Sequence, residues 1–217
     1  MSTPDKAVVF DCDGVLVDSE KAWFVGIVNV FESRGIHELV TGPASRLYGA
    51  SVGDVVTVLE RELGEPLDTD AVTKEVYGAI LAAIEDGVVA MPGAVELLEA
   101  IRGTRPLAVA SNGSAETVAA SMKAASIPNV FDTIVAVAPP LRPKPAPDLY
   151  LRACELLEVV PGEAIAVEDS LPGAKAARAA GMTVVGLGPA DGLAVTADLV
   201  VPGLLDPGLL DLLGFSS

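Results

Sequence analysis

The sequence predicts an α/β fold in which an open parallel sheet carries an inserted all-α segment. Two observations support this prediction. From Met91 onward, short β-branched runs alternate with Ala- and Leu-rich stretches of helical period, which is typical of parallel strands joined by crossover helices. Between Glu20 and about Val88, helical period dominates and no strand pattern interrupts it. The sequence therefore predicts one α/β domain with a helical segment inserted into it.

The expected strands are short apolar runs bounded by Gly, Pro or charge: Ala7–Phe10, Leu107–Ala110, Ile134–Val137, Ala164–Val167, Thr183–Leu187 and Leu199–Val201. The expected helices of the same part are Ala94–Ile101, Ser114–Ala125, Asp148–Leu157 and Gly173–Ala180, with a short terminal helix after Leu204. This alternation predicts a Rossmann-like core, whose ligands bind beyond the carboxyl ends of the strands.

The inserted helical segment leaves the core after the first strand. Its apolar positions include Val25, Val28 and Phe31, and Pro92-Gly93 marks its return to the core. We therefore predict a core domain of residues 1–16 and 89–217 and a helical domain of residues 17–88.

Composition excludes several classes of function. The 217 residues are 51% hydrophobic, enough for a sizeable core, and no apolar run approaches the roughly 20 residues that cross a bilayer. The first residues, MSTPDK, lack the pattern of a secretory signal, and the two cysteines form no paired motif, so we expect a cytoplasmic protein. The formal charge of −16 disfavours nucleic acid and anionic membranes as partners. It also disfavours an anionic substrate, unless a metal or well-placed cations reverse the local field.

The first motif of chemical interest is Asp11-Cys12-Asp13-Gly14, directly after the strand Ala7–Phe10. Because strand side chains alternate, Asp11 and Asp13 point the same way. Two carboxylates at a strand end repel each other, so this arrangement favours a divalent cation or a shared proton. The alternative is a turn, because Asp-Gly is common in turns.

Three further motifs follow expected strands. Ser111-Asn112 precedes a helix and suits phosphate oxygens, Lys144 stands between prolines, and Glu168-Asp169 offers hard oxygen ligands. Each alone has a structural explanation, as an N-cap, a stiff loop with a solvated lysine, or a helix cap. All four motifs nevertheless fall at the carboxyl ends of expected parallel strands, which brings them into one crevice.

These four motifs, in this order, resemble the haloacid dehalogenase superfamily in its phosphatase and β-phosphoglucomutase-like branch with an α-helical cap, over essentially the whole chain. The resemblance implies a hydrolase of phosphate monoesters with three catalytic residues. Asp11 becomes an aspartyl phosphate, Asp13 is the general acid and base, and Lys144 neutralises charge on the nucleophile and the phosphoryl group. The resemblance also implies sets of binding residues. These are Ser111, Asn112, Gly14 and Lys144 for phosphate, and Asp11, Asp13, Glu168 and Asp169 for Mg²⁺.

The helical segment is similar to the cap of this family, which closes over the site and selects the leaving group. Candidate substrate contacts in the cap are Glu20, Trp23 and Arg46. In β-phosphoglucomutases a histidine of the first cap helix assists proton control, and the matching position here is Trp23. We therefore expect a phosphatase of a small phosphorylated metabolite such as a sugar phosphate. The resemblance also implies a monomer.

Two alternatives stay open at this point. The first is a phosphomutase of the β-phosphoglucomutase type, which would pass through a bisphosphate. The second is a phosphorylation-dependent signalling protein or a non-catalytic phosphate-binding protein. In a receiver-type signalling module the acceptor aspartate would follow a middle strand of the chain, and no helical segment would be inserted.

Overall fold

The computed structural model describes residues 6–37, 51–85, 87–189 and 192–215. Six strands form a parallel sheet: β1 (Ala7–Phe10), β4 (Leu107–Ser111), β5 (Thr133–Ala136), β6 (Ala164–Glu168), β7 (Thr183–Leu187) and β8 (Leu199–Val201). Their order across the sheet is β5-β4-β1-β6-β7-β8, so β1 lies between β4 and β6. This confirms the predicted α/β fold.

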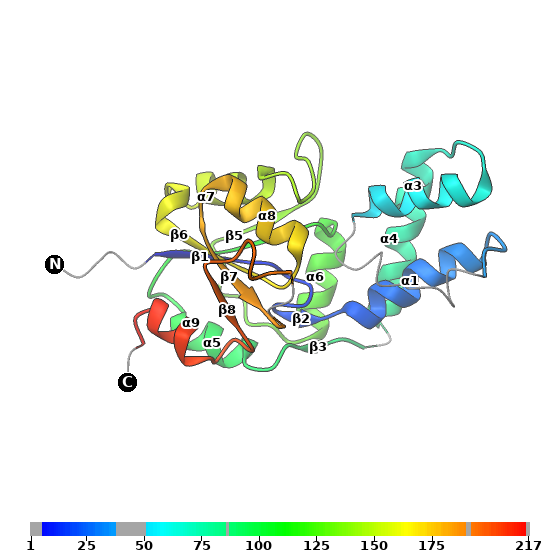
Figure 1. The fold of residues 1–217 in the computed structure, drawn as a ribbon. Helices are drawn as coiled ribbons and strands as arrows, with labels where there is room; N and C mark the ends of the chain where they lie inside the picture. Colours follow the sequence, from blue (N-terminus) through cyan, green and yellow to red (C-terminus); the bar gives the residue numbers. More distant parts are fainter. Residues whose placement is uncertain (1–5, 38–50, 86, 190–191, 216–217) are drawn as a thin grey trace.

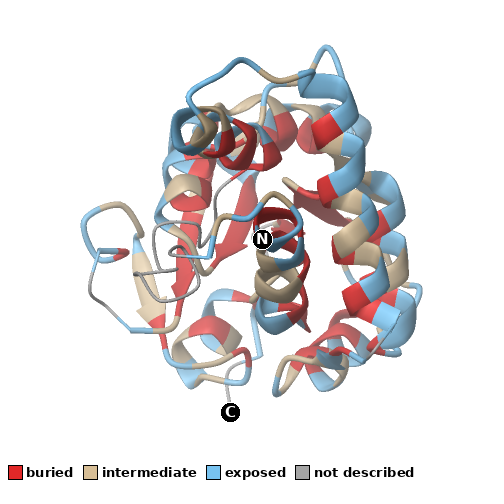
Figure 2. Cartoon of the chain, turned by 90° about the vertical axis from the view of Figure 1, so that its right-hand side faces the viewer, coloured by how far each residue is buried: buried red, intermediate tan, exposed pale blue. Residues whose placement is uncertain are grey.

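Helices cover both faces of the sheet (Figure 1). They are α5 (Ala94–Ile101) and α9 (Pro207–Leu212) on one face, α7 (Asp148–Leu156) and α8 (Leu171–Ala180) on the other, with α6 (Ala115–Ala124) against β5 and a short 3₁₀ helix, η2 (Pro161–Glu163), before β6. Alternate residues of β1 pack into two apolar clusters, Val8 and Phe10 into one, Ala7 and Val9 into the other. The central strands β1, β4 and β6 are therefore fully buried between the helices, and Figure 2 shows the buried strands inside the molecule.

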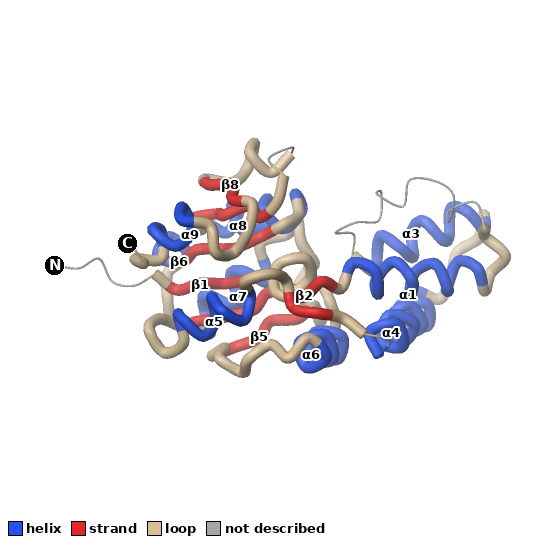
Figure 3. The backbone as a smooth tube through the Cα atoms, turned by 90° about the horizontal axis from the view of Figure 1, so that it is seen from below, coloured by secondary structure: helices blue, strands red, loops and turns tan. Residues whose placement is uncertain are grey.

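The helical insertion begins and ends at a small antiparallel ribbon. Its strands are β2 (Val17–Asp18) and β3 (Val89–Ala90), and between them lie α1 (Glu20–Glu32), α3 (Val52–Leu63) and α4 (Thr69–Glu85). These helices lie beyond the carboxyl end of β1 (Figures 1 and 3). The ribbon stands at the expected boundaries of residues 17 and 88, while the division into two separate domains stays a prediction. No helix in the described part of the chain is long and apolar enough to span a bilayer.

Most expected elements agree with the structure within one residue, and the exceptions have physical causes. Helix α8 begins at Leu171, two residues before the expected Gly173, because Ser170 caps it by accepting a hydrogen bond from the Gly173 N–H. Pro172 in the first turn is compatible with this start. The ribbon of β2 and β3 was not predicted, because two-residue strands show no recognisable period.

Candidate active site

Three neighbouring strands end at the motif residues. Asp11 directly follows β1, and its N–H continues the pairing by donating to the Val167 carbonyl of β6 at 3.0 Å. Strands β4 and β6 flank β1 and end at Ser111 and Glu168. The first, second and fourth motifs therefore meet at one edge of the sheet, as expected.

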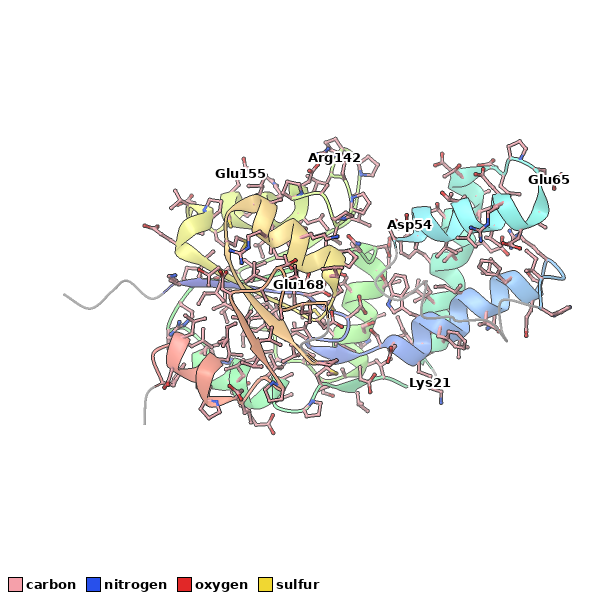
Figure 4. The ribbon with its side chains drawn as sticks, viewed as in Figure 1. Lys21, Asp54, Glu65, Arg142, Glu155 and Glu168 are labelled. Carbon is pink, nitrogen blue, oxygen red and sulfur yellow. The ribbon has the colours of Figure 1, made fainter. Side chains whose placement is uncertain are left out.

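A cavity of about 760 Å³ opens at this edge. The predicted site residues that line it are Asp11, Asp13, Gly14, Glu20, Trp23, Asn112, Lys144 and Asp169. Ser111 and Glu168 are fully buried beneath this lining, and Figure 4 shows Glu168 inside the molecule. Arg46 lies outside the described residues. All the predicted core site residues thus gather around one cavity.

Lys144 is the only buried lysine or arginine among the described residues. Its Nζ donates to Asp11 Oδ1 at 2.8 Å and to Glu168 Oε1 at 2.6 Å. Burial alone would lower the pKa of Lys144, but the carboxylates of Asp11 and Glu168 outweigh it and raise that pKa. The Lys144 N–H donates to Asn112 Oδ1 at 2.8 Å. The Asn112 side chain therefore binds the backbone of Lys144, a contact that the sequence did not reveal.

Asp13 accepts hydrogen bonds from three side chains. The Ser19 hydroxyl and Trp23 Nε1, the latter at 3.1 Å, donate to Oδ1, and the Ser111 hydroxyl donates to Oδ2 at 3.3 Å. Burial raises the pKa of Asp13, and these hydrogen bonds offset part of that rise. A buried carboxyl group with a raised pKa can carry a proton closer to neutral pH, as a general acid requires.

Asp11, Glu168 and Asp169 could hold a metal ion, because each offers a carboxylate oxygen within 4.8 Å of the others. Burial raises the pKa of Asp11; Lys144 opposes this shift, and the charges of Glu168 and Asp169 add to it. Burial, followed by the charge of Glu168, raises the pKa of Asp169 to about 7. The cluster thus has three carboxylates, of which Asp11 and Glu168 contact the one buried ammonium group. The excess negative charge and the all-oxygen donor set fit Mg²⁺.

Gly14 lies against Asp169 of the carboxylate cluster. Its φ is +78°, and a Cβ added there would lie 1.9 Å from Asp169 Oδ2. A side chain at this position would be strained and would also displace the Asp169 carboxylate. Packing against Asp169 thus explains why a glycine occupies position 14, which also lines the cavity.

In the described part of the helical insertion, α1 and α4 each contact a motif residue. Trp23 of α1 reaches Asp13 and packs edge-to-face on Tyr77 of α4, with ring centroids 6.4 Å apart. The Tyr77 hydroxyl donates to the Asn112 carbonyl at 3.3 Å. Glu20 is exposed at the cavity wall. The sequence predicted Trp23 only as a candidate substrate contact, and its hydrogen bond to Asp13 is a new observation.

Tyr150 is a site residue that sequence reasoning missed. It is fully buried on α7, and its hydroxyl donates to Glu168 Oε1 at 2.5 Å. Lys144 Nζ lies 5.0 Å from the centroid of its ring. A buried tyrosine hydroxyl requires a polar partner, so the apolar periodicity of Asp148–Leu156 could have indicated the burial, although not the partner.

Comparison with known proteins gives this arrangement a family. The family model described as haloacid dehalogenase-like hydrolase matches residues 6–181, most of the chain. The chain belongs to this family. This haloacid dehalogenase (HAD) protein is 36% identical over 193 residues to SUPPRESSOR OF QUENCHING 1, chloroplastic, of Arabidopsis thaliana, covering 82% of the chain but only 17% of that protein. It is also 34% identical over 182 residues to 6-phosphogluconate phosphatase of Escherichia coli, covering 82% of the chain and 80% of the relative.

Solved structures place the HAD protein in the expected phosphatase and β-phosphoglucomutase-like branch. A mutant CbbY protein from Rhodobacter sphaeroides, solved with xylulose-(1,5)bisphosphate, superposes with a TM-score of 0.80 at 27% identity, covering 96% of this chain and 98% of the other. A putative β-phosphoglucomutase from Thermotoga maritima superposes with a TM-score of 0.67 at 27% identity, covering 90% and 94%. The chain is thus an HAD hydrolase of phosphate monoesters, similar to phosphatases of sugar phosphates.

Proposed function

We propose that this HAD phosphatase hydrolyses a small phosphorylated metabolite of the sugar phosphate class, with Mg²⁺, through an aspartyl phosphate on Asp11. The observation that carries the proposal is the single cavity where Asp11, its Lys144 partner and the hydrogen-bonded Asp13 meet. The names of the relatives, 6-phosphogluconate phosphatase and hexitol phosphatase A of Escherichia coli, support the substrate class.

In the first step, a carboxylate oxygen of Asp11 attacks the phosphorus atom and the bond from phosphorus to the ester oxygen breaks. Asp13 gives its proton to the departing oxygen, so that a neutral alcohol leaves. Lys144 stabilises negative charge on the phosphoryl oxygens, while Ser111 and the Asn112 amide bind these oxygens. Positioning and charge stabilisation supply most of the acceleration in such reactions.

In the second step, water hydrolyses the aspartyl phosphate. The Asp13 carboxylate takes a proton from the water molecule, whose oxygen attacks phosphorus and releases inorganic phosphate and the Asp11 carboxylate. Asp13 ends this step protonated and is ready for the next ester.

Asp11, Glu168 and Asp169, with the Asp13 carbonyl, would hold Mg²⁺ at the carboxylate cluster. The ion would supply positive charge that neutralises the carboxylates and the phosphoryl oxygens. This local positive charge would offset the general repulsion between a chain of charge −16 and an anionic ester.

The helical insertion of residues 17–88 acts as the cap domain in this proposal. Helix α1 carries Trp23 and Glu20 into the cavity lining, so this helix contributes to the space for the leaving group. A cap that excludes bulk water protects the aspartyl phosphate from premature hydrolysis and selects the ester.

Replacing the nucleophile tests the proposal. Asp11→Asn should abolish turnover of p-nitrophenyl phosphate in the presence of Mg²⁺, because an amide oxygen is a poor nucleophile. Asp70→Asn is the matched control, since Asp70 is exposed at the start of α4, and it should retain wild-type turnover. Undiminished turnover by Asp11→Asn would refute the assignment.

A phosphomutase is the second candidate, favoured by the likeness to the putative β-phosphoglucomutase structure. The two activities differ in the fate of the phosphoryl group. A phosphatase releases inorganic phosphate in proportion to the alcohol formed, whereas a phosphomutase is primed by a sugar bisphosphate and releases little phosphate. Measuring both products from one sugar phosphate distinguishes them.

A further inference from the structure

The cavity has an apolar part that the four motifs do not use. Asp11 and Asp169 follow β1 and β6, whereas Leu187 lines the cavity at the end of β7 and Leu204 lines it just beyond β8. These strands lie in the order β1-β6-β7-β8. Because neighbouring strands lie about 4.8 Å apart, the cavity extends along the sheet edge from Asp11 for about 10 Å to β7 and about 14 Å to β8. It is therefore longer than a phosphate group requires.

Helix α1 supplies a second apolar wall beyond the carboxyl ends of the strands (Figure 3). Phe24, Val28 and Phe31 recur at spacings of four and three, which places them on one face of the helix, and all three line the cavity. Phe24 and Val28 are only half-buried. Leu171, at the start of α8, is 38% exposed in the same lining. Apolar surface that stays open in a cavity favours a ligand that covers it with apolar groups.

Polar side chains at the motif end of the cavity are already bound within the protein. Ser19 and Trp23 donate to Asp13, and the Asn112 side chain binds the Lys144 backbone. Each hydroxyl group of a bound polyol requires a polar partner, because burying an unpaired hydroxyl costs free energy. The described lining therefore offers few partners to a leaving group with many hydroxyl groups.

Charged side chains of the lining disfavour a second anion. Lys144 is the only lysine or arginine among the described residues of the cavity, and it contacts Asp11. Away from the motifs, the charged residues of the described lining are Asp18 and Glu20, both exposed and acidic. Like charges repel each other, so a leaving group with a carboxylate or a second phosphate would be repelled from this part of the cavity.

We infer that the leaving group is an uncharged alcohol with an apolar body and few hydroxyl groups, which packs between α1 and the ends of β7 and β8. This inference rests on the proposed function and narrows its substrate class. The phosphoryl group lies at Asp11 and Lys144, and the alcohol extends from there along the sheet edge to Leu187 and Leu204. The cavity of about 760 Å³ has the size of cavities that hold small organic ligands.

Two esters of the same shape test the inference. Cyclohexylmethyl phosphate and glucose 6-phosphate are both primary esters on a six-membered ring, and they differ in the ring oxygen and the hydroxyl groups. With Mg²⁺, we expect kcat/KM to be at least about tenfold higher for cyclohexylmethyl phosphate, because its ring covers the apolar walls and leaves no hydroxyl unpaired. A ratio near one, or a preference for glucose 6-phosphate, would overturn the inference.

Val28→Gln places an amide in the α1 wall and keeps a residue that favours helix. It should lower kcat/KM for cyclohexylmethyl phosphate about threefold or more and change that for glucose 6-phosphate little. Leu151→Gln is the matched control, since Leu151 of α7 is 43% exposed and lies outside the cavity lining, and it should keep the wild-type preference. Thermal unfolding verifies that both variants fold. An unchanged preference in Val28→Gln would contradict the inference.

Binding to Asp11→Asn provides a readout that does not depend on turnover. In calorimetry with Mg²⁺, this variant should bind cyclohexylmethyl phosphate about tenfold more tightly than glucose 6-phosphate. Equal affinities, or tighter binding of glucose 6-phosphate, would overturn the inference. Absence of Mg²⁺-dependent turnover of every ester by the wild type would refute the proposed function instead, while the two affinities would still decide which leaving group the cavity accepts.

Discussion

Asp13 and Trp23 show how a single side-chain contact can control a proposed catalytic proton. Indole N–H groups donate and cannot accept, so Asp13 Oδ1, which accepts from Trp23 and Ser19, is the oxygen less able to carry a proton. The proton of the neutral acid therefore belongs on Oδ2, beside Ser111. A histidine at position 23 could accept a hydrogen bond as well as donate one. It would therefore determine less firmly which oxygen of Asp13 carries the proton.

Trp23→Phe tests this contact, since it removes the N–H and keeps an aromatic ring. We expect kcat/KM for phenyl phosphate, whose leaving group requires protonation, to fall about tenfold, and kcat/KM for p-nitrophenyl phosphate to fall much less. Val25→Ala on the same helix is the control, because Val25 is partly buried and packs against the core cluster. Equal losses with both esters would show that Trp23 acts only through packing.

Asp169 gives a pH dependence to the metal-free protein. Because its folded pKa is raised to about 7, its contribution to stability is fully present below the unfolded pKa and is lost as pH rises through the folded pKa. With EDTA, Tm should therefore fall from about pH 5 to about pH 8. The rise in Tm on adding Mg²⁺ should be larger at about pH 8, because the ion binds the deprotonated carboxylate.

Differential scanning fluorimetry at both pH values, with EDTA or with Mg²⁺, checks this prediction. Asp169→Asn is the control and should show a weaker pH dependence and a smaller response to Mg²⁺. An equal Mg²⁺ response at both pH values would contradict the account of Asp169.

Among the elements, α1 and α4 of the helical insertion pack closely at Gly26. A Cβ added at Gly26 would lie 2.7 Å from the backbone of Ile80, so the two helices meet only because no side chain intervenes. An ion pair at 2.5 Å also joins Arg34, which lies just after the end of α1, to Glu75 of α4. Such an exposed pair contributes less than about 1 kcal/mol, so we attribute the docking of α1 on α4 to packing.

Two glycine substitutions separate packing from helix propensity. Gly26→Ala should lower the free energy of unfolding by about 1–3 kcal/mol, because the added methyl group overpacks the interface. Gly78→Ala on α4 should raise it by about 0.5–1 kcal/mol, because a Cβ there meets nothing within 4 Å. Urea unfolding measures both. A Gly26→Ala protein as stable as wild type would show that the interface can adjust.

At the scale of the whole molecule, the sheet was predictable because each strand has its own local pattern. The runs Thr183–Leu187 and Leu199–Val201 are strands with the expected bounds. The meeting of the four motifs was also predictable, since parallel strands bring their carboxyl ends to one edge.

Tertiary contacts between side chains of different elements could not be predicted in the same way. The bond of Trp23 to Asp13 depends on where α1 lies over the sheet, and the bond of Tyr150 to Glu168 joins α7 to β6. Periodicity identifies the buried face of a helix but does not identify the polar group that the face meets. These contacts therefore required the structure.

Trapping the phosphorylated enzyme tests the central claim, that the four motifs form one site for phosphoryl transfer to Asp11. Acid quenching during turnover of a phosphate ester with Mg²⁺, followed by mass spectrometry of the peptides, should find one phosphoryl group on Asp11, and none after EDTA treatment. A phosphoryl group on another residue, or turnover that leaves Asp11 unmodified at every quench time, would contradict the account.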